Sequence, residues 1–202
     1  VELSCAGTLA VEIQNGKSVG IIDLTKGEMG TRGDAQTRAQ EAKDAAEILG
    51  VSVRENLGFK DALFVNDEDH KREVVRVLRQ YQPKVVFCNA IKDRHIDHGR
   101  ASQLVSEACF LSGLKKYETK LNGEAQYQWR PSNVYHYIQW HDIEPNFVVD
   151  ISSTIEMKIA SVKAYKTQFH NPQSKEPETP ISSSNFMESI SYRARNFGRI
   201  IG

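Results

Sequence analysis

Short β-branched and apolar runs alternate along this chain with longer segments in which apolar residues recur at three- and four-residue steps. The first pattern is typical of strands buried on both faces, and the second of amphipathic helices. We expect helices at 2–15, 35–49, 67–82 and 99–112, with short strands at 18–25, 51–59 and 84–89. This alternation predicts an α/β fold that is Rossmann-like, with a mostly parallel sheet and helices on both faces.

The rest of the chain is less regular. A polar, loop-like stretch is expected first, and a Pro- and Ser-rich segment should form an exposed, mobile loop before a last helix. The expected elements are the loop 115–131, strands 132–139 and 146–152, a helix at 154–169, the exposed loop 171–184 and a helix at 185–198. A chain of 202 residues can form one hydrophobic core, so we expect a single domain over residues 1–202.

Composition excludes several classes of partner. Lys plus Arg and Asp plus Glu each number 26, so bulk charge indicates neither a nucleic acid nor a membrane surface. No apolar run approaches the ~18 residues of a membrane span. Three cysteines without CxxC spacing are typical of buried thiols in a reducing compartment, which favours the cytoplasm; one catalytic thiol is the alternative.

Both ends of the sequence resemble the interior of a longer protein. The chain begins "VELSCAG", without Met and already in an amphipathic pattern, and it stops within the apolar run "RIIG". We therefore expect that functional residues can lie upstream of Val1.

Two polar segments follow predicted strands, at 25–34 and 89–98. In open α/β sheets, ligands bind beyond the carboxyl ends of the strands, so we expect both segments to face one crevice. The first segment lacks the GxGxxG order and the Walker lysine, which makes nucleotide binding improbable.

The second segment carries the motif "DRHIDH". His95 and His98 are three residues apart and can face the same way on a helix or tight turn. Imidazole is a common metal ligand, and Asp93 or Asp97 can orient it. In the alternative interpretation, Asp97 caps a helix that starts near Gly99 and both histidines are exposed loop residues.

Three segments together, "VELSCAGTLA", "GEMGTRGDAQTRAQEA" and "DRHIDHGRAS", resemble the LmbE-like, or PIG-L-type, zinc-dependent deacetylases of N-acetylglucosamine conjugates. The similarity runs from Val1 to about Phe169, and the subgroup that it resembles most is the bacillithiol-biosynthesis deacetylases. It implies a Zn²⁺ enzyme that removes an N-acetyl group by attack of a metal-activated water on the amide. It also implies a small-molecule substrate, with N-acetylglucosaminyl malate as the best single candidate, and a homo-oligomer.

The resemblance assigns roles position by position. In that family an "AHPDD" segment precedes the residues matching "VELSCAGT"; its His and second Asp bind zinc and its first Asp is the general base. None of these lies in this sequence. The carried-over roles are His98 as third zinc ligand, His95 as electrophile or general acid, Asp97 as the residue that fixes the His95 tautomer, and Glu2 and Asp93 as residues supporting the site. Ile96 stands where the family usually has Pro, which should alter the stiffness of the loop more than ligation.

Three arginines are candidate substrate contacts, because a guanidinium fork suits carboxylates and phosphates. Arg38 matches the arginine with which the family grips the part of the substrate beyond the sugar, and Arg32 lies in the Gly-rich loop. A surface ion pair is the alternative for Arg38. Arg130 precedes a strand and is a candidate for the same crevice, or an edge residue. His136 alternates with tyrosines and is expected to be a strand residue.

Two other functions remain open on the sequence alone. One is a metal-dependent amidase or esterase acting on a non-sugar substrate. The other is a non-catalytic sugar-binding relative that has lost its metal, because His98 alone cannot hold zinc.

Overall fold

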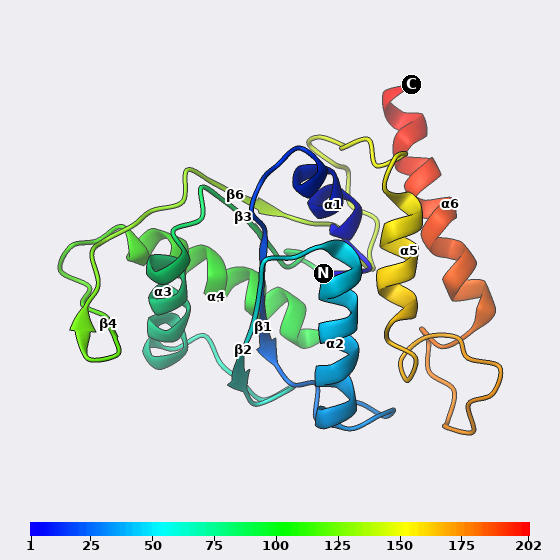
Figure 1. The fold of residues 1–202 in the computed structure, drawn as a ribbon, viewed down its shortest axis with the longest axis horizontal. Coiled ribbons are helices and arrows are strands. Elements are labelled where there is room, and N and C mark those ends of the chain that lie inside the picture. The colour runs from blue at the N-terminus through cyan, green and yellow to red at the C-terminus, as the bar shows by residue number, and fades with distance from the viewer. The chain divides into compact units, whose positions relative to one another are not determined.

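The computed structural model describes residues 1–202, which form two compact units. One unit contains Val1–Gly58 and Glu144–Gly202, and the other contains Phe59–Ile143. Figure 1 labels the elements. They are α1 (Ala6–Gln14), β1 (Gly20–Thr25), α2 (Ala35–Leu49), β2 (Val53–Phe59), α3 (Glu68–Tyr81), β3 (Val85–Cys88), α4 (Ile96–Ser112), β4 (Lys120–Leu121), β5 (Glu124–Ala125), β6 (Asn133–His136), α5 (Ile155–Lys163) and α6 (Ser184–Ile201).

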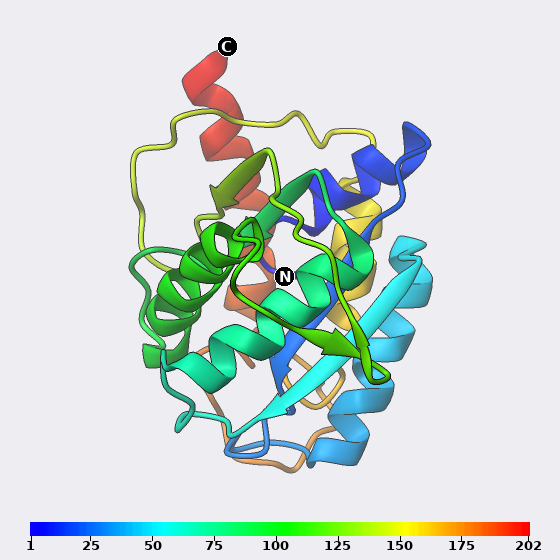
Figure 2. The same ribbon diagram turned by 90° about the vertical axis from the view of Figure 1, so that its left-hand side faces the viewer.

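The first unit contains the strand pair β1–β2 and the helices α1, α2, α5 and α6. Helix α2 packs against α5, which also contacts α1 (Figure 2). The bounds of α2 agree with the sequence prediction, because local signals set them. Asp34 accepts a hydrogen bond from the Thr37 N–H at 2.7 Å at its start, and Gly50 ends it with φ +75°.

A buried ionic cluster connects the start of the chain to β1 and β2. The Arg54 guanidinium donates to both carboxylate oxygens of Asp23 at 2.7 and 2.9 Å, and to Glu2 Oε1 at 2.7 Å. Tyr165 also donates to Glu2 Oε1, at 3.1 Å. Burial works to raise the pKa of Glu2, but the positive charges beside it, Arg54 among them, outweigh burial and lower it. Glu2 is therefore an anion held in place by this cluster.

Lys158 anchors the segment before α1 from the opposite side. Its ammonium group is buried and donates to the carbonyl oxygens of Leu3 and Ser4 at 2.9 and 2.7 Å. Burial lowers the pKa of Lys158 to about 8. In an unfolded chain the pKa of lysine is about 10.4. Between pH 8 and this value the unfolded state binds more protons than the folded state, so the free energy of unfolding rises with pH.

We therefore predict a pH-dependent difference between the native chain and Lys158→Met. From about pH 7 to about pH 10, the free energy of unfolding of the native chain should rise relative to the variant by about 2 kcal/mol. Urea denaturation of both proteins at the two pH values measures this difference. A difference that does not change with pH would show that Lys158 is not buried in its charged form near neutral pH.

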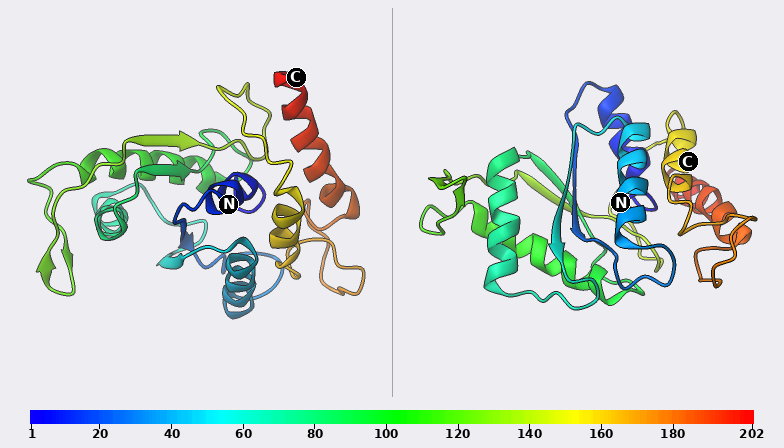
Figure 3. Two further views of the ribbon diagram at one scale, coloured as in Figure 1. Left: turned by 45° about the horizontal axis from the view of Figure 1, so that its top comes forward. Right: turned by 60° about the horizontal axis from the view of Figure 1, so that its bottom comes forward.

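The second unit contains the parallel pair β3–β6, in which Val85 pairs with Asn133 and Cys88 with His136. Figure 3 shows the two strands running side by side along α4. Helices α3 and α4 pack against each other, and α4 also contacts both strands. The parallel strands, with helix α4 between them in the sequence, confirm the α/β class that the sequence predicts.

Several sequence predictions about individual elements need correction, among them the start of α1, which begins at Ala6 and not at residue 2. No strand forms at 146–152, and at its end the Asp150 carboxylate accepts both the N–H and the hydroxyl of Ser152 in a local turn. Helix α5 ends at Lys163 rather than near 169. The stretch 115–131 is not only loop, since it contains the small antiparallel hairpin β4–β5.

None of the six helices combines the length and apolar character that crossing a bilayer requires. All three cysteines are buried and none forms a disulfide. The burial of all three thiols agrees with the sequence prediction.

Candidate metal and catalytic site

The motif "DRHIDH" lies where β3 ends and α4 begins, and the helix starts three residues earlier than the sequence predicts. His95 is the N-cap of α4, and its Nδ1 accepts the Asp97 N–H at 3.3 Å. His98 follows within the first turn, and the rings of the two histidines lie 5.2 Å apart between centroids. The helix start therefore brings both imidazoles together at the carboxyl end of β3, where α/β proteins bind ligands.

Asp93 orients His98. The Asp93 side chain is 2% exposed, and its Oδ1 lies 3.2 Å from His98 Nδ1. The Trp140 N–H donates to Asp93 Oδ2 at 3.1 Å and the His95 N–H donates to Oδ1 at 3.4 Å. Burial works to raise the pKa of Asp93, but the Trp140 N–H and the charge of His98 outweigh it and lower the pKa. Asp93 is thus a fixed carboxylate beside His98.

His98 has the properties of a metal ligand. Burial lowers its pKa against the opposing charge of Asp93, so the imidazole is neutral near neutral pH. Its Nδ1 is buried without a hydrogen bond of good geometry, even though Asp93 lies within ion-pair distance. An imidazole with one nitrogen turned towards a carboxylate is typical of metal-binding histidines, whose other nitrogen binds the metal.

The Asp97 carboxylate makes its hydrogen bonds away from the His95 ring, and it is the Asp97 backbone N–H that donates to His95 Nδ1. The Asp97 Oδ2 accepts the Ala62 N–H at 2.8 Å, and Oδ1 accepts Arg100 Nη1 at 2.8 Å. Arg100 also donates to the Ala62 carbonyl oxygen at 3.2 Å. Ala62 has the unusual φ of +62°, so these contacts hold a strained turn. Asp97 and Arg100 fix the 60–64 turn against α4.

His136 belongs to this neighbourhood, although the sequence indicates only a strand residue. It is the last residue of β6, so the prediction that it lies in a strand is confirmed. Its Nδ1 lies 3.0 Å from the Asn89 carbonyl oxygen, 2.9 Å from Ser102 Oγ and 3.3 Å from Cys88 Sγ. His136 thus joins the first residue of the 89–95 loop to α4. His136 lies opposite Cys88 in the β3–β6 pair, and this pairing is what places it near the 89–95 loop. The sequence alone does not show which strands pair, so it could not predict this position.

The residues present supply one ligand of a metal site. No group of three or more His, Cys, Asp and Glu side chains is arranged to hold a metal ion. A neutral imidazole with a buried, unsatisfied nitrogen beside a carboxylate nevertheless fits one position of such a site. His98 is therefore compatible with the third-ligand role, while the other two ligands that the resemblance implies are not among residues 1–202.

The Gly-rich loop and its two arginines lie in the first unit. Arg38 reaches back from α2 over the loop: its Nη1 donates to the Gly27 carbonyl oxygen at 3.0 Å, and a Cβ on Gly27 would clash with the same nitrogen. Arg32 is 4% exposed and contacts Ser174 and Glu176. Both arginines are therefore fixed within this unit. The predicted crevice shared with the "DRHIDH" loop stays a prediction.

Arg130, for which the sequence leaves a place in the crevice or at an edge open, contacts the far end of α4 from the two histidines. Its Nη2 donates to the Phe110 carbonyl oxygen at 2.8 Å and its guanidinium stacks on the Phe110 ring at 4.5 Å. Phe110 is near the carboxyl end of α4, whereas His95 caps its amino end. Fourteen helical residues span about 21 Å, which is beyond the length of an arginine side chain.

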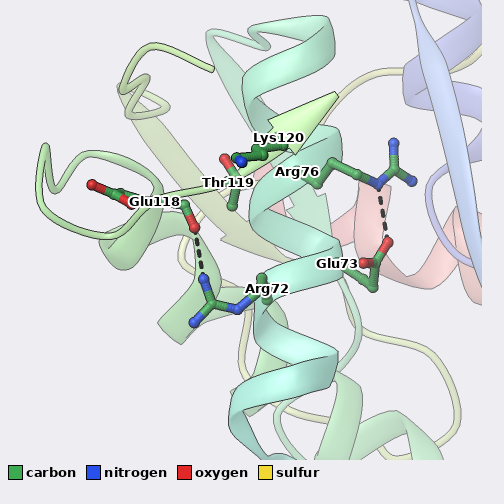
Figure 4. Close-up of a pocket in the computed structure, with 6 residues that line it drawn as sticks. All are labelled: Arg72, Glu73, Arg76, Glu118, Thr119 and Lys120. Atoms are coloured by element: carbon green, nitrogen blue, oxygen red, sulfur yellow. Dashed lines mark hydrogen bonds and ion pairs between the residues drawn. The ribbon is translucent and has the colours of Figure 1, made fainter. Parts of the chain in front are cut away.

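A separate pocket of about 350 Å³ opens on the surface of α3 (Figure 4). Its arginines are already paired: Arg72 donates to the Glu118 carbonyl oxygen and to Glu68, and Arg76 donates to Glu73. The lining residues are Arg72, Glu73, Arg76, Glu118, Thr119 and Lys120. None of them is a sequence-predicted site residue, and the pocket is distinct from the loop that carries His95 and His98.

The fold and this site define an α/β protein with an oriented imidazole–carboxylate pair at the carboxyl end of a parallel strand. The sequence profile of the family PIG-L, GlcNAc-PI de-N-acetylase, matches residues 1–109, just over half of the chain. The chain belongs to this family.

Two curated relatives and one solved structure show how far the similarity extends. A diacetylchitobiose deacetylase of Thermococcus kodakarensis is 28% identical over 177 residues, covering 83% of this chain and 65% of that protein. A 4-oxalmesaconate hydratase of Pseudomonas putida is 28% identical over 180 residues, which cover 81% of this chain and 68% of the hydratase. The crystal structure of a conserved protein from Thermus thermophilus matches with a TM-score of 0.85 and 36% sequence identity. The match covers 100% of this chain and 84% of the Thermus chain. The chain spans slightly less than two thirds of the deacetylase.

Proposed function

We propose that this protein is a metal-dependent N-deacetylase that hydrolyses the N-acetyl group of an N-acetylglucosaminyl conjugate, releasing acetate and a free amine. The observation that supports it most is the pair formed by the buried Asp93 carboxylate and the half-buried His98, between β3 and the first turn of α4. Membership of the de-N-acetylase family and the similarity to a diacetylchitobiose deacetylase support the reaction class. N-acetylglucosaminyl malate, the substrate of the bacillithiol subgroup, is our choice of conjugate.

His98 would hold the metal, with Zn²⁺ as the expected ion, and Asp93 would orient it. The other two ligands and the general base are expected upstream of the "VELSCAGT" motif, and the cluster around Glu2 and Arg54 would fix the chain where it leaves that segment. When bound, the metal lowers the pKa of water and so supplies a nucleophile at neutral pH.

His95 would act on the scissile amide. Its Nδ1 already accepts the Asp97 N–H, so Nε2 is the nitrogen left for the substrate. From there the neutral imidazole can donate a hydrogen bond to the developing oxyanion, whereas protonating the leaving amine would first require a proton on Nδ1 and loss of the Asp97 N–H contact. The Asp97 carboxylate would contribute by holding the 60–64 turn and the first turn of α4, while the Asp97 N–H contacts His95 Nδ1.

We predict that His95→Ala lowers kcat by about a hundredfold or more and leaves metal content unchanged, because the side chain acts on the scissile amide and not in ligation. Steady-state rates and elemental analysis of the same samples measure both quantities. Loss of metal together with activity would mean that the roles of the two histidines are reversed.

We further propose that the protein works in the cytoplasm and forms a homo-oligomer. The three buried thiols, none of which forms a disulfide, support a reducing compartment. Exposed apolar side chains on the second unit, among them Leu63, Ile91 and Ile96, support a subunit contact. Sedimentation velocity at micromolar concentration tests the oligomer.

Hydration of an acidic substrate is the second candidate, because one relative of 28% identity is a 4-oxalmesaconate hydratase. The two functions separate cleanly in one assay series on the full-length protein. The proposed function requires acetate and amine to appear in equal amounts from N-acetylglucosaminyl malate, and no change in 4-oxalmesaconate. Acyl amides without a sugar test the remaining alternative of a general amidase.

A further inference from the structure

The turn at residues 60–64, which follows β2, holds an alanine in a backbone conformation that alanine rarely adopts. Ala62 has φ +62°, in the left-handed region where the Cβ of an L-residue is crowded. Such a conformation persists where neighbouring contacts fix it, and it is found most often at functional sites. The contacts that fix Ala62 come from the start of α4, beside His95.

The two ends of this turn have contacts of their own. The Lys60 carbonyl oxygen accepts the Phe64 N–H at 2.8 Å. The Phe64 side chain is buried, and its ring lies 6.0 Å between centroids from that of Phe59, the last residue of β2. The ends of the turn are therefore anchored without α4, while its middle, at Ala62, depends on α4.

Arg100 closes a ring of contacts between the turn and α4. Its Nη1 donates to Asp97 Oδ1 at 2.8 Å and to the Ala62 carbonyl oxygen at 3.2 Å, while Asp97 Oδ2 accepts the Ala62 N–H at 2.8 Å. The guanidinium carbon also lies 5.4 Å from the centroid of the Phe64 ring, which adds a cation–π contact. Because the Asp97 side chain is 9% exposed, salt and water screen this pair less than a surface pair.

Asp97 transmits this constraint to His95. The Asp97 backbone N–H donates to His95 Nδ1 at 3.3 Å, so the orientation of the imidazole depends on where the Asp97 peptide lies. A ring nitrogen that accepts an N–H carries no proton itself, which leaves the proton of the neutral ring on Nε2. The contact is long, so a small displacement of the Asp97 peptide would break it.

We propose that Arg100 is a positioning residue for His95, acting through Asp97 and the strained turn 60–64. The inference rests on the proposed function in taking His95 to act on the scissile amide. Without the guanidinium, Ala62 would relax out of its strained conformation, and the Asp97 N–H would move with the carboxylate. Glycine at this position would keep the turn in place, because glycine adopts positive φ without a steric penalty.

The expected metal ligand is held from another direction. Asp93 orients His98, and the Trp140 N–H donates to Asp93 Oδ2 at 3.1 Å. Replacement of Arg100 should therefore disturb His95 and leave the metal in place, which separates positioning from a general loss of structure.

The test compares Arg100→Met with Lys71→Met in the full-length, metal-loaded protein, with N-acetylglucosaminyl malate as substrate. Arg100→Met should lower kcat by about tenfold or more at unchanged KM and metal content, because catalysis falls steeply when a group is displaced. Lys71 pairs with Glu107, which lies farther along α4, at 2.8 Å. Lys71→Met therefore removes an ion pair of the same helix and should change none of the three quantities.

Ala62→Gly supplies a rescue that the loss of a general structural contact would not show. Added to Arg100→Met, it should restore kcat to within about threefold of the native value, because glycine holds the turn without the guanidinium. A second readout needs no catalysis: long-range ¹H–¹⁵N spectra of histidine-labelled protein, recorded where the imidazoles are neutral, show which ring nitrogen carries the proton. His95 should show one tautomer, protonated on Nε2, in the native protein and both tautomers in Arg100→Met.

A single His95 tautomer in Arg100→Met would overturn the proposal, as would native kcat, loss of metal together with activity, or a loss of kcat that Ala62→Gly does not restore. Should Arg100→Met not fold, Arg100→Gln takes its place, because glutamine keeps a hydrogen-bond donor but ends two bonds short of Nη1; the same spectra then decide. A protein that releases no acetate while Arg100→Met still mixes the tautomers would retain the positioning role and refute the deacetylase.

Discussion

His98→Ala is expected to remove the bound metal and to abolish catalysis in the full-length protein. His98 is the one side chain in the described chain that combines a buried, unsatisfied ring nitrogen with a neighbouring carboxylate. A catalytic zinc site has about three protein ligands, so the loss of one leaves two and the metal dissociates. Activity should fall by at least about a thousandfold, since both the nucleophile and the stabilisation of the oxyanion depend on the ion.

Two further variants show whether a loss of metal is specific to ligation by His98: Asp93→Asn removes the carboxylate beside it, and His170→Ala is a control histidine. Asparagine at 93 keeps the shape but removes the charge that orients His98, so metal affinity should fall by about 10- to 100-fold without complete loss. His170 is exposed and distant in sequence from the motif, and its replacement should change neither metal content nor rate. Elemental analysis after dialysis gives the three metal contents. Full metal occupancy in His98→Ala would refute its role as ligand.

Arg54→Met is expected to cause the largest loss of stability of any substitution considered. Arg54 neutralises Glu2 and Asp23 at once, and its side chain is 11% exposed. Removing it leaves Glu2, whose side chain is 10% exposed, as a buried charge without its partner. Breaking a buried ion pair from one side costs about 3–5 kcal/mol. The midpoint of urea denaturation should fall accordingly.

Lys43→Met is the matched control for this prediction. Lys43 pairs with Glu47 one helical turn away on α2, and both side chains are 68% exposed. Exposed pairs of this kind contribute little, so its unfolding free energy should stay close to that of the native chain. If Arg54→Met were as stable as Lys43→Met, the cluster could not be what fixes the segment before α1.

Local signals in the sequence predicted those parts of the fold that local interactions determine. Asp34 and Gly50 bound α2 through hydrogen bonds and backbone geometry within a few residues, and the prediction of both ends is confirmed. The start of α4 was misplaced because its N-cap is a histidine, a residue type that carries little capping preference. The prediction of a strand at 146–152 was wrong, and a local Asp–Ser turn forms at its end.

The sequence predicted which histidines belong to the candidate site but not which carboxylates contact them. The spacing of His95 and His98 indicated a common direction, which the helix start provides. Which carboxylate serves which histidine could not be predicted, because Asp97 is held by Ala62, 35 residues upstream, and Asp93 by Trp140, 47 residues downstream. The same holds for the Pro- and Ser-rich segment 171–184: composition indicates an exposed loop, while the contact between Arg32 and Glu176 spans 144 residues.

The most direct test of the central claim is acetate release from N-acetylglucosaminyl malate by the full-length, metal-loaded protein beside His98→Ala. We predict one acetate for each free amine, at a rate that falls to background in the variant together with the metal. A native protein that binds its metal and releases no acetate from this or any other N-acetylglucosaminyl compound would contradict the account.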